Sequence, residues 1–255
     1  MPELPDIQVF ANNLKLLLAG SKLLSINIVN GKKLKDSKAD LKTLEGKTLK
    51  DVFRSGKELR FLFSDKNILG IHLMLTGDLK EGPIQNERIT IAELRFSKMT
   101  ITLTDRMKNA YVRLNPENKN GIDALDKSLN FKYLKTALNR KTNIKNVLLD
   151  QDVIRGIGNS YSDEILWETR ISPFSVAKAI PDEKIKELAS TIKKVLKKAT
   201  ATIEKTHPGL INGEVKEFLK IHTKKKPESP TGYPIKMADR GMLKTYYTDE
   251  QVEYK

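Results

Sequence analysis

The sequence predicts an α+β protein: an N-terminal helix with an antiparallel β-sandwich, then a helical domain that ends in a β-hairpin. Apolar residues repeat with helical spacing over residues 6–18. Between about residues 24 and 104 they alternate in short runs that turn residues separate, with no helical pattern between them. Helical spacing returns after about residue 130. These three observations place the strands in one domain and most helices in another.

The chain is expected to divide at a polar, turn-rich stretch near residues 115–130. We predict a β-sandwich domain, a linker, a helical domain and a terminal β-hairpin segment, at residues 1–115, 116–130, 131–218 and 219–255.

The first helix has one apolar face, and Gly20 is placed to end it. Its apolar residues are Ile7, Phe10, Leu14, Leu17 and Leu18. Six strands are then predicted, at residues 24–28, 48–54, 58–63, 67–74, 88–96 and 99–104.

The C-terminal half repeats its apolar residues at helical spacing in three places, near residues 131–138, 144–148 and 185–196. A lysine-rich stretch precedes two short extended runs, at 232–237 and 243–248, which residues 238–242 separate. Tyrosines in these runs favour a packed β-hairpin, although a disordered basic tail is the alternative.

The charge balance points to a polyanionic partner. The 255 residues include 46 Lys and Arg against 32 Asp and Glu, a net charge of +14. No basic amphipathic segment carries a matching aromatic face, so nucleic acid is favoured over a membrane. Cysteine is absent, which excludes disulfides and thiolate chemistry, and with three histidines we expect no metal and no cofactor. Without a signal sequence or membrane-length apolar run, a cytoplasmic protein is expected.

The first six residues, Met-Pro-Glu-Leu-Pro-Asp, contain a candidate nucleophile. Removal of Met1 turns Pro2 into a rigid secondary amine, which can attack the C1′ of a sugar and form an iminium. Glu3 beside it is placed to transfer protons. The plainer alternative is that the two prolines only mark the start of the first helix.

Two turns in the N-terminal half carry further candidates. Ser55-Gly56-Lys57 places a lysine at a tight hairpin, where its ammonium can reach a phosphate or simply be solvated. In the segment His72-Leu73-Met74-Leu75-Thr76-Gly77-Asp78, apolar residues run directly into a turn. That pattern is typical of a wedge that enters a base stack, or of a buried strand end.

A glycine-rich turn lies between two predicted helices in the C-terminal half. Gly156 and Gly158 permit a tight turn, and a helix starting near Asn159 offers unpaired N–H groups to a phosphate. No strand precedes the turn and a third glycine is missing, so this is not a dinucleotide site. A helix–turn–helix that contacts the DNA backbone fits better.

Together these segments resemble the Fpg/Nei (formamidopyrimidine-DNA glycosylase/endonuclease VIII) family over most of the chain. The N-terminal Met-Pro-Glu-Leu-Pro resembles its signature, and the residue 72–77 segment resembles its HLGMSG motif. Residues 149–164 resemble its helix–two-turn–helix (H2TH) motif. The C-terminal hairpin resembles the family's zinc finger without its metal, a zincless finger.

The resemblance implies a bifunctional DNA glycosylase/AP lyase that flips a damaged base out of duplex DNA. Pro2 attacks C1′ and releases the base, and β-elimination, with δ-elimination possible after it, cleaves the strand. Glu3 is the acid/base partner, and Lys57 contacts phosphate and assists proton transfer. Asn159 and Lys145 match DNA-binding positions of the family. The implied partner is damaged double-stranded DNA, bound by a monomer that associates with the nucleoid.

Several positions depart from the family pattern. Asp6 replaces a glutamate. His72 is another candidate DNA contact. In the same segment the family has a methionine that fills the void left by the flipped base, and Leu75 stands at that position here. In the stretch that aligns with the family's DPRRFG, an arginine and a phenylalanine appear as Met107 and Asn109.

The finger arginine has no exact counterpart: alignment places it at Leu243, with Arg240 and Lys244 as nearby candidates. Two alternatives stay open, the first of them because of these departures. One is a lesion- or abasic-site-binding paralogue with weak or no excision, and the other is a structural nucleoid protein that relies on its charge alone.

Overall fold

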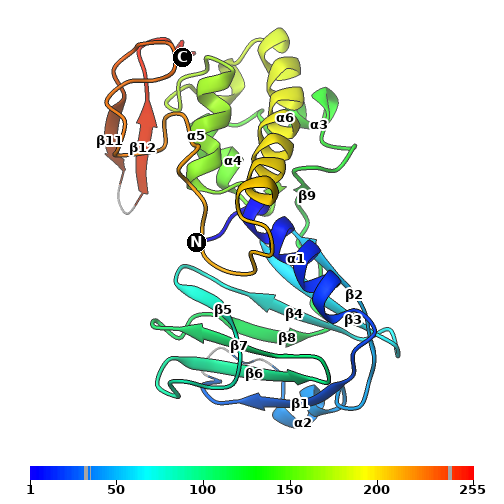
Figure 1. The fold of residues 1–255 in the computed structure, drawn as a ribbon. Helices are drawn as coiled ribbons and strands as arrows, with labels where there is room; N and C mark the ends of the chain where they lie inside the picture. The colour runs from blue at the N-terminus through cyan, green and yellow to red at the C-terminus, as the bar shows by residue number, and fades with distance from the viewer. Residues whose placement is uncertain (32–33, 35, 241–242) are drawn as a thin grey trace. The chain divides into compact units, whose positions relative to one another are not determined.

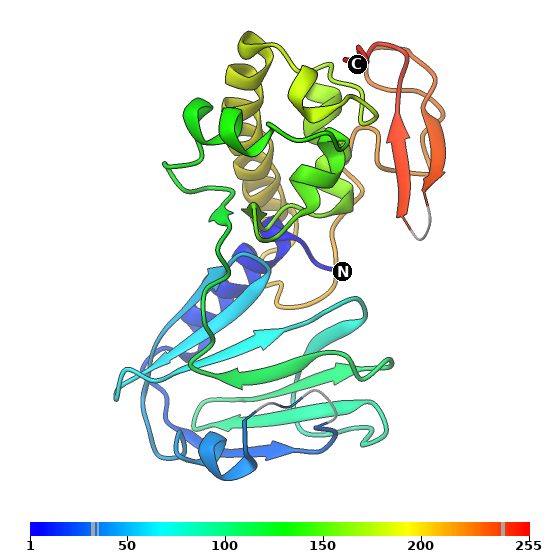
Figure 2. The ribbon, with the colours of Figure 1, turned by 180° about the vertical axis from the view of Figure 1, so that it is seen from behind.

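The structure is a computed structural model that describes residues 1–31, 34, 36–240 and 243–255. The chain forms two units. Unit 1 comprises residues 1–118 and 202–214, and unit 2 comprises residues 119–201 and 215–255 (Figures 1 and 2).

Unit 1 is a sandwich of two four-stranded antiparallel sheets with the strand orders β1-β6-β7-β5 and β2-β3-β4-β8. The first sheet contains β1 (Leu23–Ile28), β5 (Gly77–Glu81), β6 (Thr90–Phe96) and β7 (Thr100–Asp105). The second contains β2 (Leu49–Ser55), β3 (Glu58–Phe63), β4 (Ile68–His72) and β8 (Tyr111–Leu114). A short helix, α2 (Lys38–Lys42), follows β1.

Helix α1 (Leu4–Leu18) closes the core of unit 1 by packing on β2 and β3. Phe10 and Leu14 of α1 are fully buried, as are Phe61 and Phe63 of β3. One hydrophobic cluster joins these residues to the inner faces of both sheets. The predicted fold class is therefore confirmed for this half of the chain.

In unit 1, two strands, β5 and β8, were not predicted. Each lies at one edge of its sheet and pairs with one neighbour only, as do the predicted strands β1 and β2 at the opposite edges. An edge strand keeps one side exposed and tolerates charged residues. In β5 the residues Asp78, Lys80 and Glu81 therefore obscure the alternation that marks the inner strands.

Unit 2 is mainly helical. It contains α3 (Phe131–Ala137), α4 (Ile144–Leu149), α5 (Asn159–Glu168), the 3-10 turn η1 (Ala177–Ala179) and α6 (Asp182–Thr206), whose residues 202–206 count with unit 1. The two-residue strands β9 (Ile122–Asp123) and β10 (Ile154–Arg155) pair in parallel. The predicted helices are thus observed, and α5 begins at Asn159 as expected.

The chain ends in an antiparallel hairpin of β11 (Lys236–Arg240) and β12 (Leu243–Tyr247). We predicted the first strand at 232–237, but it starts at Lys236 because Gly232 (φ +83°) lies in a turn and Pro234 has no N–H to donate. It also continues to Arg240, so residues 238–240, predicted as turn, are strand. The rest of that turn, 241–242, lies outside the described residues.

Candidate active site and DNA-binding residues

The first residues of the chain form the start of α1. Glu3 is the N-cap of the helix and is 3% exposed, and its backbone N–H donates to Asp6 Oδ2 at 3.0 Å. The shorter carboxylate of Asp6 therefore still closes the first turn. A capping arrangement of this kind fixes the entry angle of the chain, which here holds the buried Pro2 in place.

Pro2 lines a cavity of about 510 Å³ in unit 1. Leu75 and Arg106 also line it, as do three carboxylate residues, Asp78, Asp105 and Glu214. The amino group of Met1 forms an ion pair with Glu214, and the backbone N–H of Gly213 donates to Asp78 Oδ1 at 3.1 Å. The segment 213–214 is thereby fastened to the wall that carries Pro2.

Among the predicted residues of unit 1, Pro2 and Leu75 share this cavity. Glu3, Lys57 and His72 are not among its lining residues in the described part of the chain. Lys57 lies in the two-residue turn between β2 and β3, where Ser55 pairs with Glu58 and Gly56 has a φ of +60°. Glycine adopts this left-handed conformation without strain, so the turn presents the lysine at a fixed point.

His72 ends β4 and is held from two sides. Its Nδ1 accepts the backbone N–H of Met74 at 3.0 Å, and its ring stacks on Tyr111 with 5.4 Å between centroids. Because Nδ1 is the acceptor, a neutral ring carries its proton on Nε2, which is then a donor. A donor at this position suits the predicted contact with DNA.

Leu75 is exposed at a constrained turn. Its side chain is 60% exposed, and the preceding Met74 has a φ of +54°. Gly77 closes the turn by donating its N–H to Leu73 O at 2.8 Å, and a Cβ at Gly77 would lie only 2.1 Å from that oxygen. Of the two sequence interpretations, wedge and buried strand end, the exposure favours the wedge.

A second exposed apolar side chain, Met107 (53% exposed), lies in a loop organised by Asp105. The Asp105 carboxylate accepts the backbone N–H groups of Met107 (2.9 Å), Asn109 (2.7 Å) and Ala110 (2.7 Å), and the hydroxyl of Thr76. Burial raises the pKa of Asp105, but these hydrogen bonds outweigh burial and hold the pKa below its usual value. The carboxylate is therefore ionised and fixes the loop.

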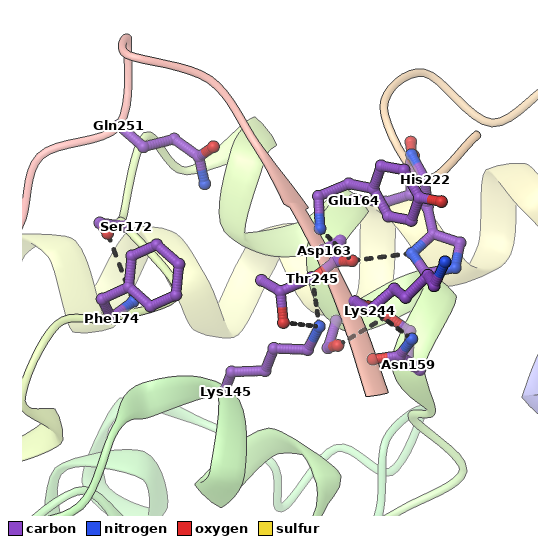
Figure 3. A network of polar contacts seen from close by, with 12 residues as sticks. Lys145, Asn159, Asp163, Glu164, Ser172, Phe174, His222, Lys244, Thr245 and Gln251 are labelled. Carbon is purple, nitrogen blue, oxygen red and sulfur yellow. Dashed lines mark hydrogen bonds and ion pairs between the residues drawn. The ribbon is translucent and has the colours of Figure 1, made fainter. Parts of the chain in front are cut away.

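In unit 2, Asn159 and Lys244 meet at the start of α5 (Figure 3). Asn159 Nδ2 donates to the backbone carbonyl of Lys244 at 2.9 Å, whereas its Oδ1 has no hydrogen-bond partner. An amide nitrogen carries two hydrogens, so one remains for a phosphate. The N-cap of α5 is Gly158, which supplies no side-chain cap.

Lys145 of α4 is buried in unit 2. Its Nζ donates to Asp163 Oδ1 at 2.6 Å and to Thr245 Oγ1 at 2.9 Å, and its side chain is 7% exposed. A direct contact with DNA stays a prediction for this residue. The side chain of Lys244 is exposed, and the side chain of Arg240 lies outside the described part of the structure.

Sequence reasoning missed the residues that hold these candidates in place, chiefly Asp78, Asp105 and Glu214 in unit 1 and Thr245 in unit 2. Their partners are 29 to 213 positions away in sequence or are backbone groups. The one sequence signal was the position of Asp105 directly after a predicted strand.

Among the described residues, no group of three or more His, Cys, Asp or Glu side chains is placed to hold a metal ion. Within the same part of the chain, no helix is long and apolar enough to cross a membrane.

Comparison with known proteins extends these observations. The formamidopyrimidine-DNA glycosylase N-terminal domain matches residues 1–113, and the formamidopyrimidine-DNA glycosylase H2TH domain matches residues 121–208. The formamidopyrimidine-DNA glycosylase of Lactobacillus gasseri is 32% identical over 87% of this chain and 86% of that protein. The Mycoplasma genitalium protein of the same name is 30% identical over 88% of this chain and 86% of its own.

The fold matches solved structures of Lactococcus lactis Fpg. Its complex with an abasic site containing DNA has a TM-score of 0.87 at 22% identity, covering 98% of this chain and 99% of that one. Its complex with an oxidized pyrimidine containing DNA has the same TM-score at 24% identity, with the same coverage of both chains. With both domains and the whole fold matched, the chain belongs to the formamidopyrimidine-DNA glycosylase family.

Proposed function

We propose that this chain excises damaged bases from duplex DNA with Pro2 as the nucleophile and then cleaves the strand as an AP lyase. Membership of the family makes it a DNA glycosylase of base excision repair. The observation that carries the residue assignment is the position of Pro2, which lines a cavity of about 510 Å³ directly before the N-cap of α1. A cavity of this size accommodates a single nucleotide base or sugar.

The proposed reaction begins when the free amine of Pro2 attacks C1′ of the damaged nucleotide. The N-glycosidic bond breaks, and the base leaves with the bonding electrons and takes up a proton. Opening of the sugar places a proton on O4′ and leaves an iminium between Pro2 and C1′. Glu3 is assigned the proton transfers to the base and to O4′.

The iminium then makes strand cleavage possible. It withdraws electrons from C1′, so the proton on C2′ becomes acidic and is lost to a base. The released electron pair forms the C2′–C3′ double bond and expels the phosphate on the 3′ side. Hydrolysis of the iminium returns Pro2 as a free amine. Lys57 is assigned a phosphate contact and assistance with proton transfer.

The remaining predicted residues are assigned to DNA binding. Leu75 fills the space that the flipped nucleotide leaves, with its exposed side chain as support. His72 and Lys244 contact the DNA backbone, and Asn159 binds a phosphate through its second amide hydrogen. The net charge of +14 supports binding to duplex DNA at the nucleoid by phosphate neutralisation.

The lesions to test first follow from the relatives. Their names specify formamidopyrimidines, and the Lactococcus lactis Fpg structures contain abasic-site and oxidised-pyrimidine DNA. We therefore propose these three lesion classes as substrates, to be compared in single-lesion duplexes.

Borohydride trapping tests the nucleophile. Reduction of the iminium gives a stable protein–DNA adduct, so protein that begins at Pro2 is expected to be trapped on abasic-site DNA. Pro2→Gly keeps a primary amine and is expected to lose base excision at least 100-fold. A form extended by one residue turns the Pro2 nitrogen into an amide and is expected to lose both excision and trapping. Pro5→Ala, further along the same segment, is the control and is expected to behave as wild type.

Two results would overturn the assignment: no adduct with protein whose N-terminus is confirmed as Pro2 by mass spectrometry, or full trapping by the extended form. The same mass measurement shows whether Met1 has been removed.

A further inference from the structure

The finger segment, residues 219–255, needs something other than a metal to hold it. The chain has no cysteine, and the described residues contain no metal-binding group. A two-stranded hairpin is at best marginally stable by itself in water. The segment therefore depends on attachments to the rest of unit 2.

Asp163 of α5 is the point where these attachments converge (Figure 3). Its side chain is fully buried. Oδ1 accepts Lys145 Nζ at 2.6 Å. Oδ2 accepts the backbone N–H of Tyr246 at 3.0 Å and lies 2.7 Å from His222 Nδ1, which donates because a carboxylate only accepts. Three elements, α4, β12 and the start of the finger segment, are thus tied to one carboxylate.

The partners of Asp163 also contact one another. Lys145 Nζ donates to Thr245 Oγ1 at 2.9 Å, and the ring of His222 meets the ring of Tyr246 edge-on at 4.8 Å. These contacts close the network around two consecutive residues of β12.

The neighbouring Glu164 holds the entry to the finger segment. Its carboxylate accepts the backbone N–H groups of Lys220 (2.9 Å), Ile221 (2.8 Å) and His222 (2.9 Å). Asp163 and Glu164 together fix His222 through both its backbone and its side chain. One end of the finger segment is therefore attached to α5 independently of the hairpin.

We propose that Asp163 is a positioning residue for DNA binding, which takes the place of a structural metal by cross-linking His222 and Tyr246 across the finger segment. Asn159 lies one helical turn before Asp163 on α5 and donates to the carbonyl of Lys244. Side chains of α5 therefore hold β12 through the backbone groups of residues 244 and 246. The inference rests on the proposed function only in that DNA is the ligand of Asn159 and Lys244.

The isosteric variant Asp163→Asn isolates this role. Its amide oxygen can still accept the donors on one side of the group, but its NH₂ cannot accept on the other, and the negative charge beside the buried Lys145 is lost. The substitution adds one positive charge to the protein. By charge alone it should strengthen DNA binding, so weaker binding can only come from lost positioning. Glu187→Gln is the matched control, because it adds the same charge at an exposed i,i+3 pair with Lys184.

The test combines binding, kinetics and hydrogen exchange. Fluorescence anisotropy with a duplex containing a tetrahydrofuran abasic-site analogue is expected to give a Kd at least tenfold higher for Asp163→Asn, and unchanged or lower for Glu187→Gln. The single-turnover excision rate at saturating DNA is expected to stay within about threefold of wild type, since Pro2 is in unit 1. Amide exchange of residues 243–247 in the DNA-free protein is expected to accelerate at least tenfold.

An Asp163→Asn protein with wild-type Kd and wild-type exchange at residues 243–247 would overturn the proposal. If Asp163→Asn does not fold, His222→Phe replaces it. That variant keeps a ring against Tyr246 and removes the hydrogen bond, so a Kd at least threefold higher is expected, and an unchanged Kd overturns the proposal. The exchange measurement needs no catalysis, so failure of the proposed enzyme activity is distinguished from failure of the positioning role.

Discussion

Replacement of Asp105 by asparagine should loosen the loop that carries Met107. The wild-type carboxylate, 1% exposed, accepts four hydrogen bonds, two on each oxygen. The amide is expected to keep its oxygen at the Oδ2 position, where two backbone N–H groups point. Its NH₂ group then faces the Thr76 hydroxyl, which can accept, and the N–H of Met107, which cannot.

The magnitude follows from this count. One hydrogen bond to a charged acceptor is lost and the others lose their charge assistance, so the free energy of unfolding should fall by about 2–3 kcal/mol. For a chain of this length that corresponds to a decrease in Tm of roughly 5–10 °C. Asp105→Ala leaves three backbone N–H groups without an acceptor and should cost more, about 4–6 kcal/mol.

Thermal unfolding across pH checks the reasoning. The folded pKa of Asp105 lies below its ordinary value of 3.8. Its stabilising contribution is therefore present above that value and is lost as pH falls through the folded pKa. The Tm difference between wild type and Asp105→Asn should be full at pH 6 and shrink below pH 3.8. Asp126→Asn, an exposed carboxylate that accepts a backbone N–H from Ser128 at 2.7 Å, is the control and should barely change Tm. Equal Tm values for wild type and Asp105→Asn at pH 6 would refute the reasoning.

Three further predictions concern the wedge turn and the finger. Gly77→Ala places a Cβ 2.1 Å from Leu73 O, so thermal unfolding should show a loss of about 2–3 kcal/mol, and wild-type Tm would contradict the close approach. Leu75→Ala should leave Tm almost unchanged but weaken binding to damaged duplex DNA about tenfold, roughly 1.4 kcal/mol. Leu16→Ala, at an 81% exposed site, should change neither Tm nor binding. Excision should be insensitive to EDTA, and chelator-sensitive activity would contradict a metal-free finger.

The sequence predicted the elements whose pattern is local. The alternation of the predicted strands and most of the apolar face of α1 depend on residues within one strand or one turn, so they were predicted correctly. Leu17, which was placed on that face, is instead 43% exposed. Strands β5 and β8 were missed because they are short, and charged residues, Lys80 in β5 and Arg113 in β8, interrupt their apolar pattern. The start of β11 was misplaced because Tyr233 and Ile235 supplied a strand-like pattern around Pro234, which cannot pair as a central strand residue.

The candidate site, like the strands, could be predicted only where the sequence pattern is local. Pro2, Lys57, Leu75 and Asn159 could be named from short motifs. The groups that hold such residues could not, because their partners are distant in sequence. The ammonium of Lys145 contacts Thr245, 100 positions away, and that contact decides whether the lysine faces solvent or the protein interior. A motif specifies which side chain is present, whereas only the fold specifies what surrounds it.

A metal-free finger also changes how the stability of unit 2 is distributed. A structural zinc ion in a small finger supplies about 10–16 kcal/mol from one centre. Here Asp163 and Glu164 each accept three hydrogen bonds, worth roughly 1.5–3 kcal/mol each when the acceptor is charged. Burial opposes part of this gain: it raises the pKa of Glu164 above its usual value despite three N–H donors. The attachment is therefore spread over many modest contacts, and substitution of a single acidic residue is expected to weaken only part of it.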